Sequence, residues 1–417
     1  MTKFDILKQY YGYSSFRGAQ EKFIDTLMSG RDVLGVMPTG AGKSICYQIP
    51  AMLFAGITIV VSPLISLMKD QVAQLKQAGI PVAFMNSSLT PAQYQEALRR
   101  AEQGRYKIIY VAPERLTTDA FIDFAQGTSI SLLAVDEAHC VSQWGQDFRP
   151  SYLKIARFVA ALDERPVLGA FTATATDAVK KDIVRLLGLD DPLSLTTGFD
   201  RPNLYFEVAT PKDKAVYMHE LIGKRRGLCG VVYCSTRKAV EAVCTAIQRR
   251  GISATRYHAG LEDHERRQNQ DDFISGKADV IVATNAFGMG IDKPNVRYVI
   301  HYNMPKNMES YYQEAGRAGR DGKPSECIML FSKEDIKTAE FFIQSSEKNE
   351  ELSDRERRIV SRRDAESLEK MTRYCEIDSC LRSYMLRYFG EKMKGKCRNC
   401  SNCNRPSWWQ LWRIKKP

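Results

Sequence analysis

The sequence lacks the features of an exported or membrane-bound protein. Its first eight residues, Met-Thr-Lys-Phe-Asp-Ile-Leu-Lys, contain neither the apolar core nor the small-residue cleavage site of a signal peptide. The longest apolar run, residues 51–61, is much shorter than the roughly 20 residues that a membrane-spanning helix needs. Fixed-period repeats and low-complexity tracts are also absent. We therefore expect a soluble, cytoplasmic protein with no membrane partner.

Complete disulfide pairing is excluded, because the 11 cysteines are an odd number. Six cysteines lie in apolar segments and are expected to be small buried side chains in a reducing compartment: Cys46, Cys140, Cys229, Cys234, Cys244 and Cys327. The other five fall between Cys375 and Cys403. A disordered chain is excluded as well, since 44% of the residues are hydrophobic and 26% are charged. The length of 417 residues predicts about three domains.

Positive charge is concentrated at the C-terminal end of the sequence. The whole chain has a net charge of +11, and residues 391–417, with five Lys, three Arg and one Glu, carry +7 of it. Such a basic segment suits a polyanionic partner. A solvated lysine-rich terminus is the alternative explanation.

Short β-branched runs alternate with helix-length segments in the first half of the chain. Residues 57–61, 108–111 and 132–135 have the composition of strands that are buried on both faces, and residues 91–102 have the length of a helix. This alternation predicts a parallel sheet built from βαβ units.

A second set of strands is predicted after residue 205, at 230–233, 280–283, 296–301 and 327–331. Between the first two, residues 236–250 place Val240, Val243, Cys244 and Ile247 on one face of a helix. Gly and Pro at 197–202 predict the join between two α/β lobes. Charged helical sequence follows residue 335. The predicted domains are 1–203, 204–338 and a smaller helical unit at 339–417.

A phosphate-binding loop is predicted between an apolar strand and a helix. It consists of Met37, Pro38, Thr39, Gly40, Ala41, Gly42, Lys43 and Ser44. The glycines let backbone N–H groups face phosphate oxygens, Lys43 reaches the β- and γ-phosphates, and Ser44 can bind magnesium. The strict motif has Gly where Met37 stands, so a chance glycine-rich turn is the alternative.

Two acidic residues follow the predicted strand at 132–135, at the end where ligands bind open α/β sheets. Asp136 is predicted to hold magnesium, and Glu137 to orient and deprotonate the attacking water. The alternative is an acidic strand-to-loop turn without a catalytic role.

Two arginines in the second lobe complete this chemistry. An arginine supplied from outside a nucleotide site stabilises the charge that develops on the γ-phosphate during transfer. Gln313, Arg317 and Arg320 have the spacing for such a role. A basic helix start with flexible glycines is the alternative.

The C-terminal cysteines have the spacing of a structural metal site. Cys397, Cys400 and Cys403 are separated by two residues each, and Cys380 or Cys375 can provide a fourth thiolate. Four thiolates form a closed tetrahedral zinc site without an open position for catalysis. Iron–sulfur ligation is the alternative.

Taken together, these motifs resemble superfamily-two helicases, and specifically the RecQ family of DNA helicases. The resemblance covers residues 8–404. It is carried by the phosphate loop, the Asp-Glu-Ala-His tetrapeptide at 136–139, the Gln-Glu-Ala-Gly-Arg-Ala-Gly-Arg-Asp-Gly stretch at 313–322, and the segments 13–20, 62–71, 111–116, 142–150, 171–175 and 286–294. It implies that Cys380, rather than Cys375, is the fourth zinc ligand.

The resemblance also implies how the nucleotide base is recognised. The amide of Gln20 can pair with the N6 donor and the N7 acceptor of adenine, while Tyr13 and Arg17 enclose the base plane. Asp292 corresponds to a residue that reaches the ribose hydroxyls. These roles predict ATP rather than GTP as the substrate. An ordinary helix entry at Tyr13 and Gln20 is the alternative.

Further residues resemble those that couple ATP hydrolysis to DNA in this family. Trp144, Phe148 and Arg149 correspond to an aromatic-rich loop that senses single-stranded DNA by stacking on its bases. His139 relays this signal, and Ser62, Lys69, Thr172 and Thr174 correspond to coupling and DNA-backbone residues. A buried Trp-Phe pair is the competing explanation for the loop.

The resemblance therefore predicts a DNA-stimulated ATPase and 3′–5′ DNA helicase that uses ATP, Mg²⁺ and Zn²⁺ and acts in recombination and repair. Its fold would be two RecA-like lobes followed by a helical zinc-binding domain. The expected partners are single-stranded and tailed duplex DNA and a single-strand-binding protein, and the expected state is a chromosome-associated monomer.

The sequence departs from the family at its end, where residues 407–417 contain three of the four tryptophans and match no family segment, and we expect the winged-helix domain to be missing. Residues 407–417 are expected to be either a stacking and charged element that replaces part of the duplex contact or a divergent or shortened end. A translocase that unwinds poorly is thus an alternative, as are RNA unwinding and a nucleic-acid-binding module with a regulatory ATP site.

Overall fold

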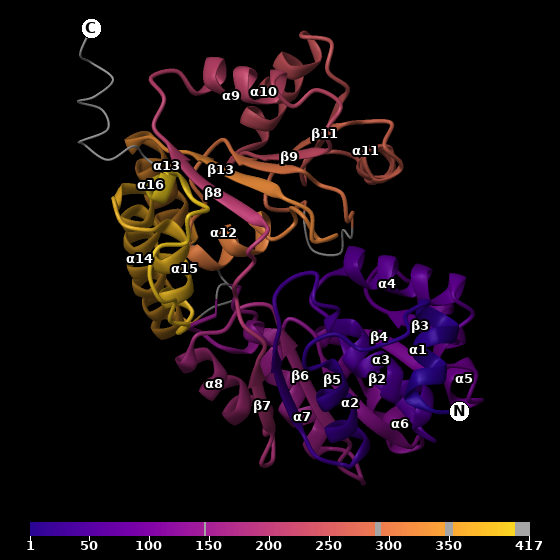
Figure 1. Ribbon diagram of the computed structural model, residues 1–417. Helices are drawn as coiled ribbons and strands as arrows, with labels where there is room; N and C mark the ends of the chain where they lie inside the picture. Colours follow the sequence, from indigo (N-terminus) through magenta and orange to yellow (C-terminus); the bar gives the residue numbers. More distant parts are fainter. Residues whose placement is uncertain (146, 288–292, 347–352, 405–417) are drawn as a thin grey trace, which may run out of the picture. The chain divides into compact units, whose positions relative to one another are not determined.

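The computed structural model describes residues 1–145, 147–287, 293–346 and 353–404. The chain divides between Gly198 and Phe199 into two compact units, and residues 353–356 are grouped with the first. Each unit is built around one parallel sheet (Figure 1). The predicted class, two tandem parallel-sheet lobes, is confirmed. The cysteine-rich region belongs to the second unit, while the domain limits 1–203, 204–338 and 339–417 stay a prediction.

The first unit has a seven-stranded sheet in the order β3-β4-β2-β5-β6-β1-β7, and every neighbouring pair is parallel. Its strands are β1 (Val33–Val36), β2 (Ile57–Val61), β3 (Val82–Met85), β4 (Ile108–Val111), β5 (Ile130–Val135), β6 (Val167–Thr172) and β7 (Leu193–Thr196). Its α-helices are α1 (Lys3–Tyr11), α2 (Gln20–Met28), α3 (Lys43–Leu53), α4 (Ile65–Gln77), α5 (Pro91–Glu102), α6 (Asp119–Gln126), α7 (Lys154–Ala160) and α8 (Asp177–Leu187). Every residue of β1, β2 and β4 is buried, so helices cover both faces of this sheet.

The second unit has a six-stranded parallel sheet in the order β10-β11-β9-β12-β13-β8. Its strands are β8 (Leu204–Ala209), β9 (Gly230–Tyr233), β10 (Ala254–Tyr257), β11 (Val280–Ala283), β12 (Tyr298–His301) and β13 (Ser325–Leu330). Its helices are α9 (Lys214–Gly223), α10 (Arg237–Gln248), α11 (Asp263–Ser275), α12 (Met308–Ala315), α13 (Lys333–Ser346), α14 (Asp354–Glu376), α15 (Leu381–Tyr388) and the short α16 (Ser401–Asn404).

Most predicted elements are present with small shifts at their ends. The strands predicted at 57–61, 108–111, 230–233 and 280–283 are confirmed, whereas the one predicted at 296–301 begins at Tyr298. Helix α5 begins where predicted, because Thr90 and Gln93 form a reciprocal capping box around Pro91. The predicted apolar face of α10 is buried in the core of the second unit.

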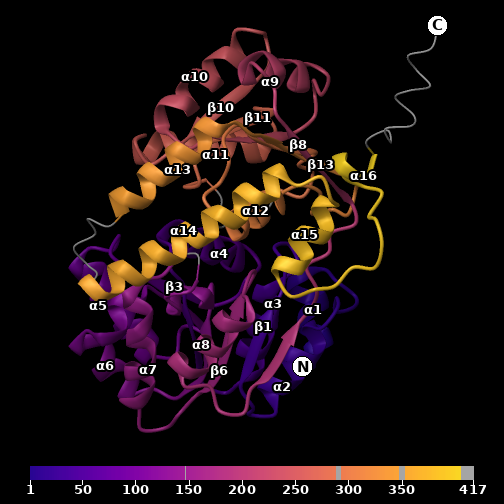
Figure 2. The ribbon, with the colours of Figure 1, turned by 90° about the vertical axis from the view of Figure 1, so that its left-hand side faces the viewer.

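The cysteine-rich region packs on the edge strand of the second sheet. Figure 2 shows α14 and α15 next to each other, and the Tyr384 hydroxyl on α15 donates to the Lys370 carbonyl on α14 at 2.9 Å. An isolated parallel bridge joins Cys400 to Phe206 on β8. The Arg382 guanidinium donates to the Asp200 carboxylate and to the Arg201 carbonyl. The edge of the sheet is thus covered by the region that carries the cysteines.

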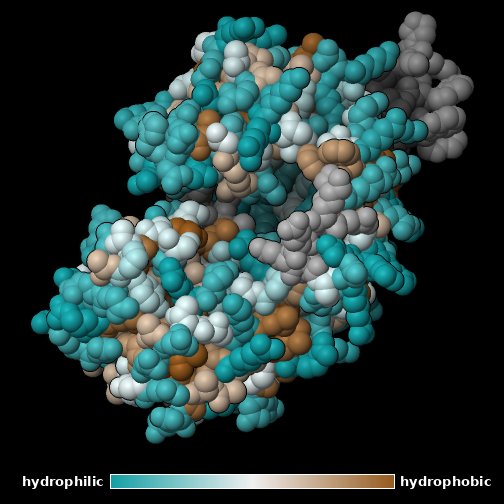
Figure 3. Space-filling model, turned by 180° about the vertical axis from the view of Figure 1, so that it is seen from behind, coloured by the Kyte–Doolittle hydropathy of each residue, from teal (hydrophilic) through white to brown (hydrophobic). Residues whose placement is uncertain are grey.

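Polar side chains cover most of the face in Figure 3, and hydrophobic residues form separate patches on it. Within the described ranges, none of the helices combines the length and the apolar character needed to span a bilayer.

Candidate functional site

The predicted phosphate loop connects β1 to α3 in the first unit. Gly40 and Gly42 have φ angles of 82° and 75°, a region that side chains other than glycine rarely adopt. A Cβ atom at Gly42 would lie 2.5 Å from the Gln20 amide nitrogen, so only glycine fits there. Lys43 is the first residue of α3, and its ammonium lies 3.5 Å from the Met37 carbonyl. The loop and the helix N-terminus together form a cradle of the kind that binds phosphate.

The departure from the strict motif at Met37 has a simple structural reason. The Met37 side chain is 1% exposed and points into the hydrophobic core, where its sulfur lies 3.8 Å from the Cys46 sulfur. A side chain that faces the core takes no space from a phosphate. Met37 therefore contributes to the loop only through its backbone.

Gln20 lies beside the phosphate loop and already uses its amide there. Its Oε1 accepts from the Arg17 backbone N–H at 2.8 Å, and its Nε2 donates to the carbonyls of Ala41 and Gly42 at 3.0 and 3.1 Å. The Arg17 guanidinium lies 5.1 Å from the centre of the exposed Tyr13 ring. Gln20 thus lies at the loop, Arg17 is hydrogen-bonded to Gln20, and the Arg17 guanidinium covers one face of the Tyr13 ring.

Asp136 and Glu137 follow β5, where their carboxylates are almost completely buried. Their exposed fractions are 7% and 9%. Burial, together with the Glu137 charge, raises the pKa of Asp136 to about 7, and the Lys43 ammonium opposes this rise. Two buried carboxylates this close need additional positive charge, so the arrangement fits a divalent cation at Asp136.

The backbone at Glu137 is strained. Its φ and ψ angles are both 47°, a left-handed conformation that costs on the order of 1–3 kcal/mol for a residue other than glycine. The Asp136 carboxylate accepts from the Glu137 backbone N–H at 3.0 Å, and the buried Tyr152 hydroxyl donates to the Asp136 carbonyl at 3.0 Å. The motifs gave no signal for Tyr152, which lies in a 3₁₀ turn at Pro150–Leu153.

His139 connects Glu137 to the end of β6. Its Nδ1 lies 2.8 Å from the Thr172 hydroxyl and 3.4 Å from a Glu137 carboxylate oxygen. The ring is 2% exposed, and burial lowers the pKa of His139, which keeps it neutral near pH 7. The Thr172 hydroxyl donates to the Thr174 carbonyl at 3.2 Å. His139 is therefore placed to pass a movement of either segment to the other.

The aromatic-rich loop packs directly on this histidine. A Cβ atom at Gly145 would lie 2.2 Å from the His139 carbonyl oxygen, so the loop approaches this closely only with glycine. Sequence reasoning did not identify Gly145. Trp144 is 48% exposed, which contradicts the buried Trp-Phe pair and leaves the indole free to stack. The Arg149 guanidinium donates to the Pro63 carbonyl at 2.7 Å and pairs with Asp147.

Three residues predicted to contact the DNA backbone are buried in this structure. The exposed fractions are 0% for Ser62, 0% for Thr172 and 2% for Thr174, and these residues lie at or just after the C-terminal ends of the buried strands β2 and β6. A direct phosphate contact does not fit their hydroxyls here, whereas the coupling role fits the Thr172 contact with His139. Lys69 is exposed on α4 and remains accessible to a phosphate.

In the second unit, Gln313 lies on α12, while Arg317 and Arg320 lie in the turn that follows it. Arg201 holds this turn by donating to three of its carbonyls, those of Gly316, Ala318 and Gly319, at 3.3, 3.0 and 2.9 Å. The Asn203 amide also donates to Gly319. The sequence suggested only a join at residues 197–202, which includes Arg201, and it gave no role for Asn203, so the positioning role of both was missed.

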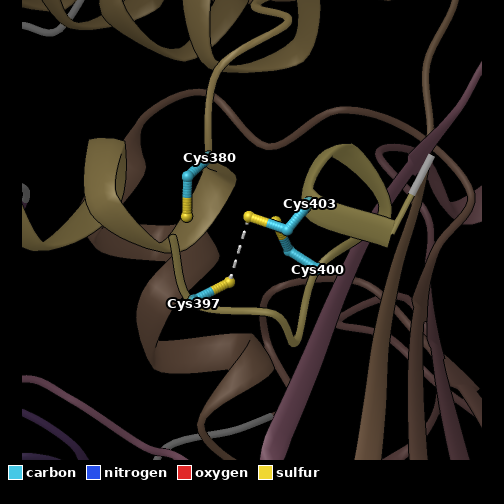
Figure 4. Close-up of side chains that lie close together, drawn as sticks. All are labelled: Cys380, Cys397, Cys400 and Cys403. Atoms are coloured by element: carbon cyan, nitrogen blue, oxygen red, sulfur yellow. Dashed lines mark hydrogen bonds between the residues drawn. The ribbon is translucent and has the colours of Figure 1, made fainter. Parts of the chain in front are cut away.

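The four predicted cysteine ligands come together beside β8 (Figure 4). The sulfurs of Cys380, Cys397, Cys400 and Cys403 all lie within 4.8 Å of one another, and those of Cys397 and Cys403 are 3.7 Å apart. Tetrahedral zinc with Zn–S bonds of about 2.3 Å requires sulfurs about 3.8 Å apart. Cys375 is buried in α14 and is not in this group. The structure thus places Cys380, and not Cys375, with the other three sulfurs.

Backbone N–H groups donate hydrogen bonds to two of the four sulfurs. Ser383 donates to the Cys380 sulfur at 3.4 Å, and Asn399 donates to the Cys397 sulfur at 3.3 Å. Burial opposes ionisation of Cys380, but N–H donation outweighs it and lowers the pKa of this thiol to about 7. A set this compact suits a single zinc ion better than a multi-iron cluster.

Asp292 and the tryptophan-rich segment 407–417 lie outside the described residues. The predicted ribose contact and the predicted role of the C-terminal segment thus stay predictions.

Three family profiles match the chain in order. A "DEAD/DEAH box helicase" profile matches residues 17–182, a "Helicase conserved C-terminal domain" profile matches 213–322, and a "RecQ zinc-binding" profile matches 333–404. The last one includes all four cysteines of the metal set.

Similar curated proteins include two bacterial ones. The "ATP-dependent DNA helicase RecQ" of Bacillus subtilis is 46% identical over 95% of this chain and 66% of the relative, and that of Haemophilus influenzae is 40% identical over 97% and 64%. The chain thus spans slightly less than two thirds of these relatives. A "Putative ATP-dependent RNA helicase" of Acanthamoeba polyphaga mimivirus is 40% identical over 95% of this chain and 71% of its own length.

Solved structures share the fold at low sequence identity. The helicase MrfA bound to DNA matches with a TM-score of 0.68 at 19% identity, over 80% of this chain and 51% of that one. A DEAD-box helicase bound to single-stranded RNA matches with a TM-score of 0.67 at 18% identity, over 83% and 76%.

We expect Cys380→Ala to abolish zinc binding and Cys375→Ala to preserve it, because only Cys380 belongs to the compact sulfur set. Inductively coupled plasma mass spectrometry measures the metal content per chain and so checks this assignment. About one zinc is expected in the unmodified protein. Iron with sulfide, or zinc loss in Cys375→Ala alone, would contradict the assignment.

Proposed function

Because the chain belongs to the RecQ family of helicases, we propose that it hydrolyses ATP to move 3′ to 5′ along single-stranded DNA and to separate a tailed duplex. The four-cysteine set, which lies within the match to the RecQ zinc-binding profile, favours DNA over RNA as the substrate, while the exposed Trp144 of the aromatic-rich loop offers a stacking surface. A base of either nucleic acid can stack on Trp144, and this contact needs no particular sequence.

In the first unit, the phosphate loop holds the β- and γ-phosphates through its backbone N–H groups and Lys43. Ser44 and Asp136 hold Mg²⁺, which when bound supplies the charge that offsets the buried carboxylates. Glu137 accepts the proton of the attacking water, and its left-handed backbone fixes the direction of its carboxylate.

The observation that carries the proposal is the contact chain from the aromatic loop to Glu137. Gly145 packs on the His139 carbonyl, and the His139 ring lies between Glu137 and Thr172. A base that stacks on Trp144 would shift the loop, and the loop cannot shift without moving His139. This link gives DNA a physical means to change the position of the hydrolytic carboxylate.

The second unit contributes Gln313, Arg317 and Arg320, which stabilise the charge on the γ-phosphate when a nucleotide is bound. Gln20, Tyr13 and Arg17 select adenine after Arg17 has left the Tyr13 ring, and Asp292 binds the ribose. Further parts of this proposal rest on the family resemblance. They are a monomeric state, a role in recombination and repair, a cytoplasmic location in association with the chromosome, and a single-strand-binding protein as partner.

The direct test compares ATP hydrolysis with and without single-stranded DNA and measures unwinding of 3′-tailed and 5′-tailed duplexes. We expect DNA to raise kcat at least tenfold and only the 3′-tailed duplex to be separated. Lys43→Ala should eliminate both activities, because it removes the charge that binds the phosphates.

Three results would change the proposal. An ATPase rate that DNA does not alter would contradict a DNA-driven enzyme and favour a binding module with a regulatory ATP site. Stimulation without strand separation would select a translocase. Stronger stimulation and unwinding with RNA would identify RNA as the substrate.

Trp144→Ala should keep the basal ATPase rate and lose most of the stimulation, because the exposed indole contacts DNA but not the nucleotide. Base stacking on an aromatic side chain contributes roughly 1–3 kcal/mol per base. ATPase titrations with single-stranded DNA measure the effect, and Phe341→Ala, which removes an exposed ring of the second unit, is the control. Full stimulation in Trp144→Ala would disprove the coupling role of the loop.

Arg201→Ala should lower kcat about 10- to 100-fold with little change in the KM for ATP, because the turn that carries Arg317 and Arg320 loses its support. A misplacement of about 1 Å in a catalytic group can cost this much. Steady-state kinetics with saturating DNA provide the measurement. Arg225→Ala, which removes an ion pair with Glu326 at the start of β13, is the matched control. Equal kcat values for the two variants would rule out the positioning role of Arg201.

A further inference from the structure

The core of the first unit contains one glutamine amide at the centre of a side-chain network. Gln48 lies on α3 and is 3% exposed. Its Nε2 donates to the Tyr110 hydroxyl at 2.8 Å and to the Gln71 Oε1 at 3.1 Å. Its Oε1 accepts from the Tyr11 hydroxyl at 3.0 Å. Both amide hydrogens and one carbonyl lone pair of Gln48 are thus used within the protein.

The partners of Gln48 come from elements with different proposed tasks. Gln48 itself follows Lys43 by about one and a half turns of the same helix. Gln71 lies on α4, two residues after the exposed Lys69, and α4 follows the loop whose Pro63 carbonyl binds Arg149. Tyr110 lies on β4, directly before residues 111–116. The network therefore joins the helix that begins at the phosphate loop to the helix that carries a proposed DNA contact.

Stability alone does not explain a polar residue at this position. Tyr110, Met68, Val72 and Leu75 belong to the same hydrophobic core. An apolar side chain at position 48 could therefore be buried there without the desolvation cost that a polar amide carries. Burial raises the pKa of the Tyr110 phenol, which therefore stays neutral and keeps its hydrogen-bonding role. A fully paired buried network holds its members in one arrangement, whereas an apolar contact tolerates sliding.

We propose that Gln48 is a positioning residue that makes the placement of α4 depend on the placement of α3, and so couples nucleotide binding to DNA binding. This inference rests on the proposed function of the chain. When phosphates move the N-terminus of α3, the Gln48 amide shifts Gln71 with it, and Lys69 moves on the same helix. Gln48 touches neither nucleotide nor DNA in this scheme.

The test is the coupling factor, defined as the Kd of a fluorescent non-hydrolysable ATP analogue without DNA divided by its Kd with saturating single-stranded DNA. Thermodynamic reciprocity makes this ratio a direct measure of coupling between the two sites. In Gln48→Met, which keeps the side-chain volume, we expect the ratio to fall at least threefold towards one. The Kd without DNA should change less than twofold.

Two sets of variants separate coupling from a loss of stability. Gln48→Met removes the partner of the buried Tyr110 hydroxyl and that of the half-buried Tyr11 hydroxyl, so adding Tyr110→Phe should restore most of the loss in the denaturation midpoint but not the coupling factor. Phe124→Leu, a core change on α6 outside the network, should lower the midpoint and keep the factor. Gln71→Leu, at a half-buried position, should reduce the factor as Gln48→Met does.

The possible failures are distinguishable. A factor of one in the unmodified protein would overturn the proposed DNA coupling and this inference together. A normal factor in Gln48→Met or Gln71→Leu, alongside DNA stimulation in the unmodified protein, would overturn only the role of Gln48. Recovery of the factor when Tyr110→Phe restores stability would also overturn that role, because it would reduce Gln48 to a packing residue.

Discussion

Asp136 and Glu137 place two carboxylates next to each other in the interior of the first unit, where water cannot separate their charges. This repulsion constrains the surrounding structure. Lys43 supplies one compensating charge from the start of α3, and the backbone N–H of Glu137 supplies a hydrogen bond to Asp136. The strained φ angle at Glu137 turns the second carboxylate towards His139. The phosphate loop, the end of β5 and the aromatic loop are therefore all linked to one pair of buried like charges, whose repulsion a bound cation would reduce.

The second unit depends on a different kind of constraint, namely backbone carbonyls that are hydrogen-bonded by side chains. Arg201 and Asn203 bind carbonyls of the arginine turn, while Arg382 and Asn399 from the cysteine-rich region bind carbonyls at 201–204. The segment 200–204 is thus fixed on one side by the arginine turn and on the other by the four-cysteine set. A metal that fixed the four-cysteine set would thereby also restrain this segment, to which the arginine turn is hydrogen-bonded.

The sequence predicted central strands such as β2, β4, β9 and β11, because all their residues are buried and such strands require continuous β-branched runs like Ile57–Val61. It did not predict the edge strands β7, β8 and β10, whose residues are only partly buried. The cysteine set was also predictable, since three ligands lie close together in the chain. Side-chain direction was not predictable at Ser62 or Thr174, because a hydroxyl at a strand end can face either the solvent or the core. Arg201 was missed for another reason. Its partners begin 115 residues later, and a Gly- and Pro-flanked segment suggests a linker until that contact is known.

Gln20 illustrates why the identity of a site residue does not determine its state. Its chemistry suits adenine, yet its amide is fully engaged by Arg17, Ala41 and Gly42. A base can pair with Gln20 only if the hydrogen bonds to the phosphate loop are exchanged, since one amide group has two hydrogens and both already point at loop carbonyls. Recognition of the base and release of the loop are then parts of the same event. A nucleotide with another base could still place its phosphates in the loop, but it would lack the partner that frees Ala41 and Gly42. Base selectivity would thus act on the conformation of the phosphate loop, and not only on affinity.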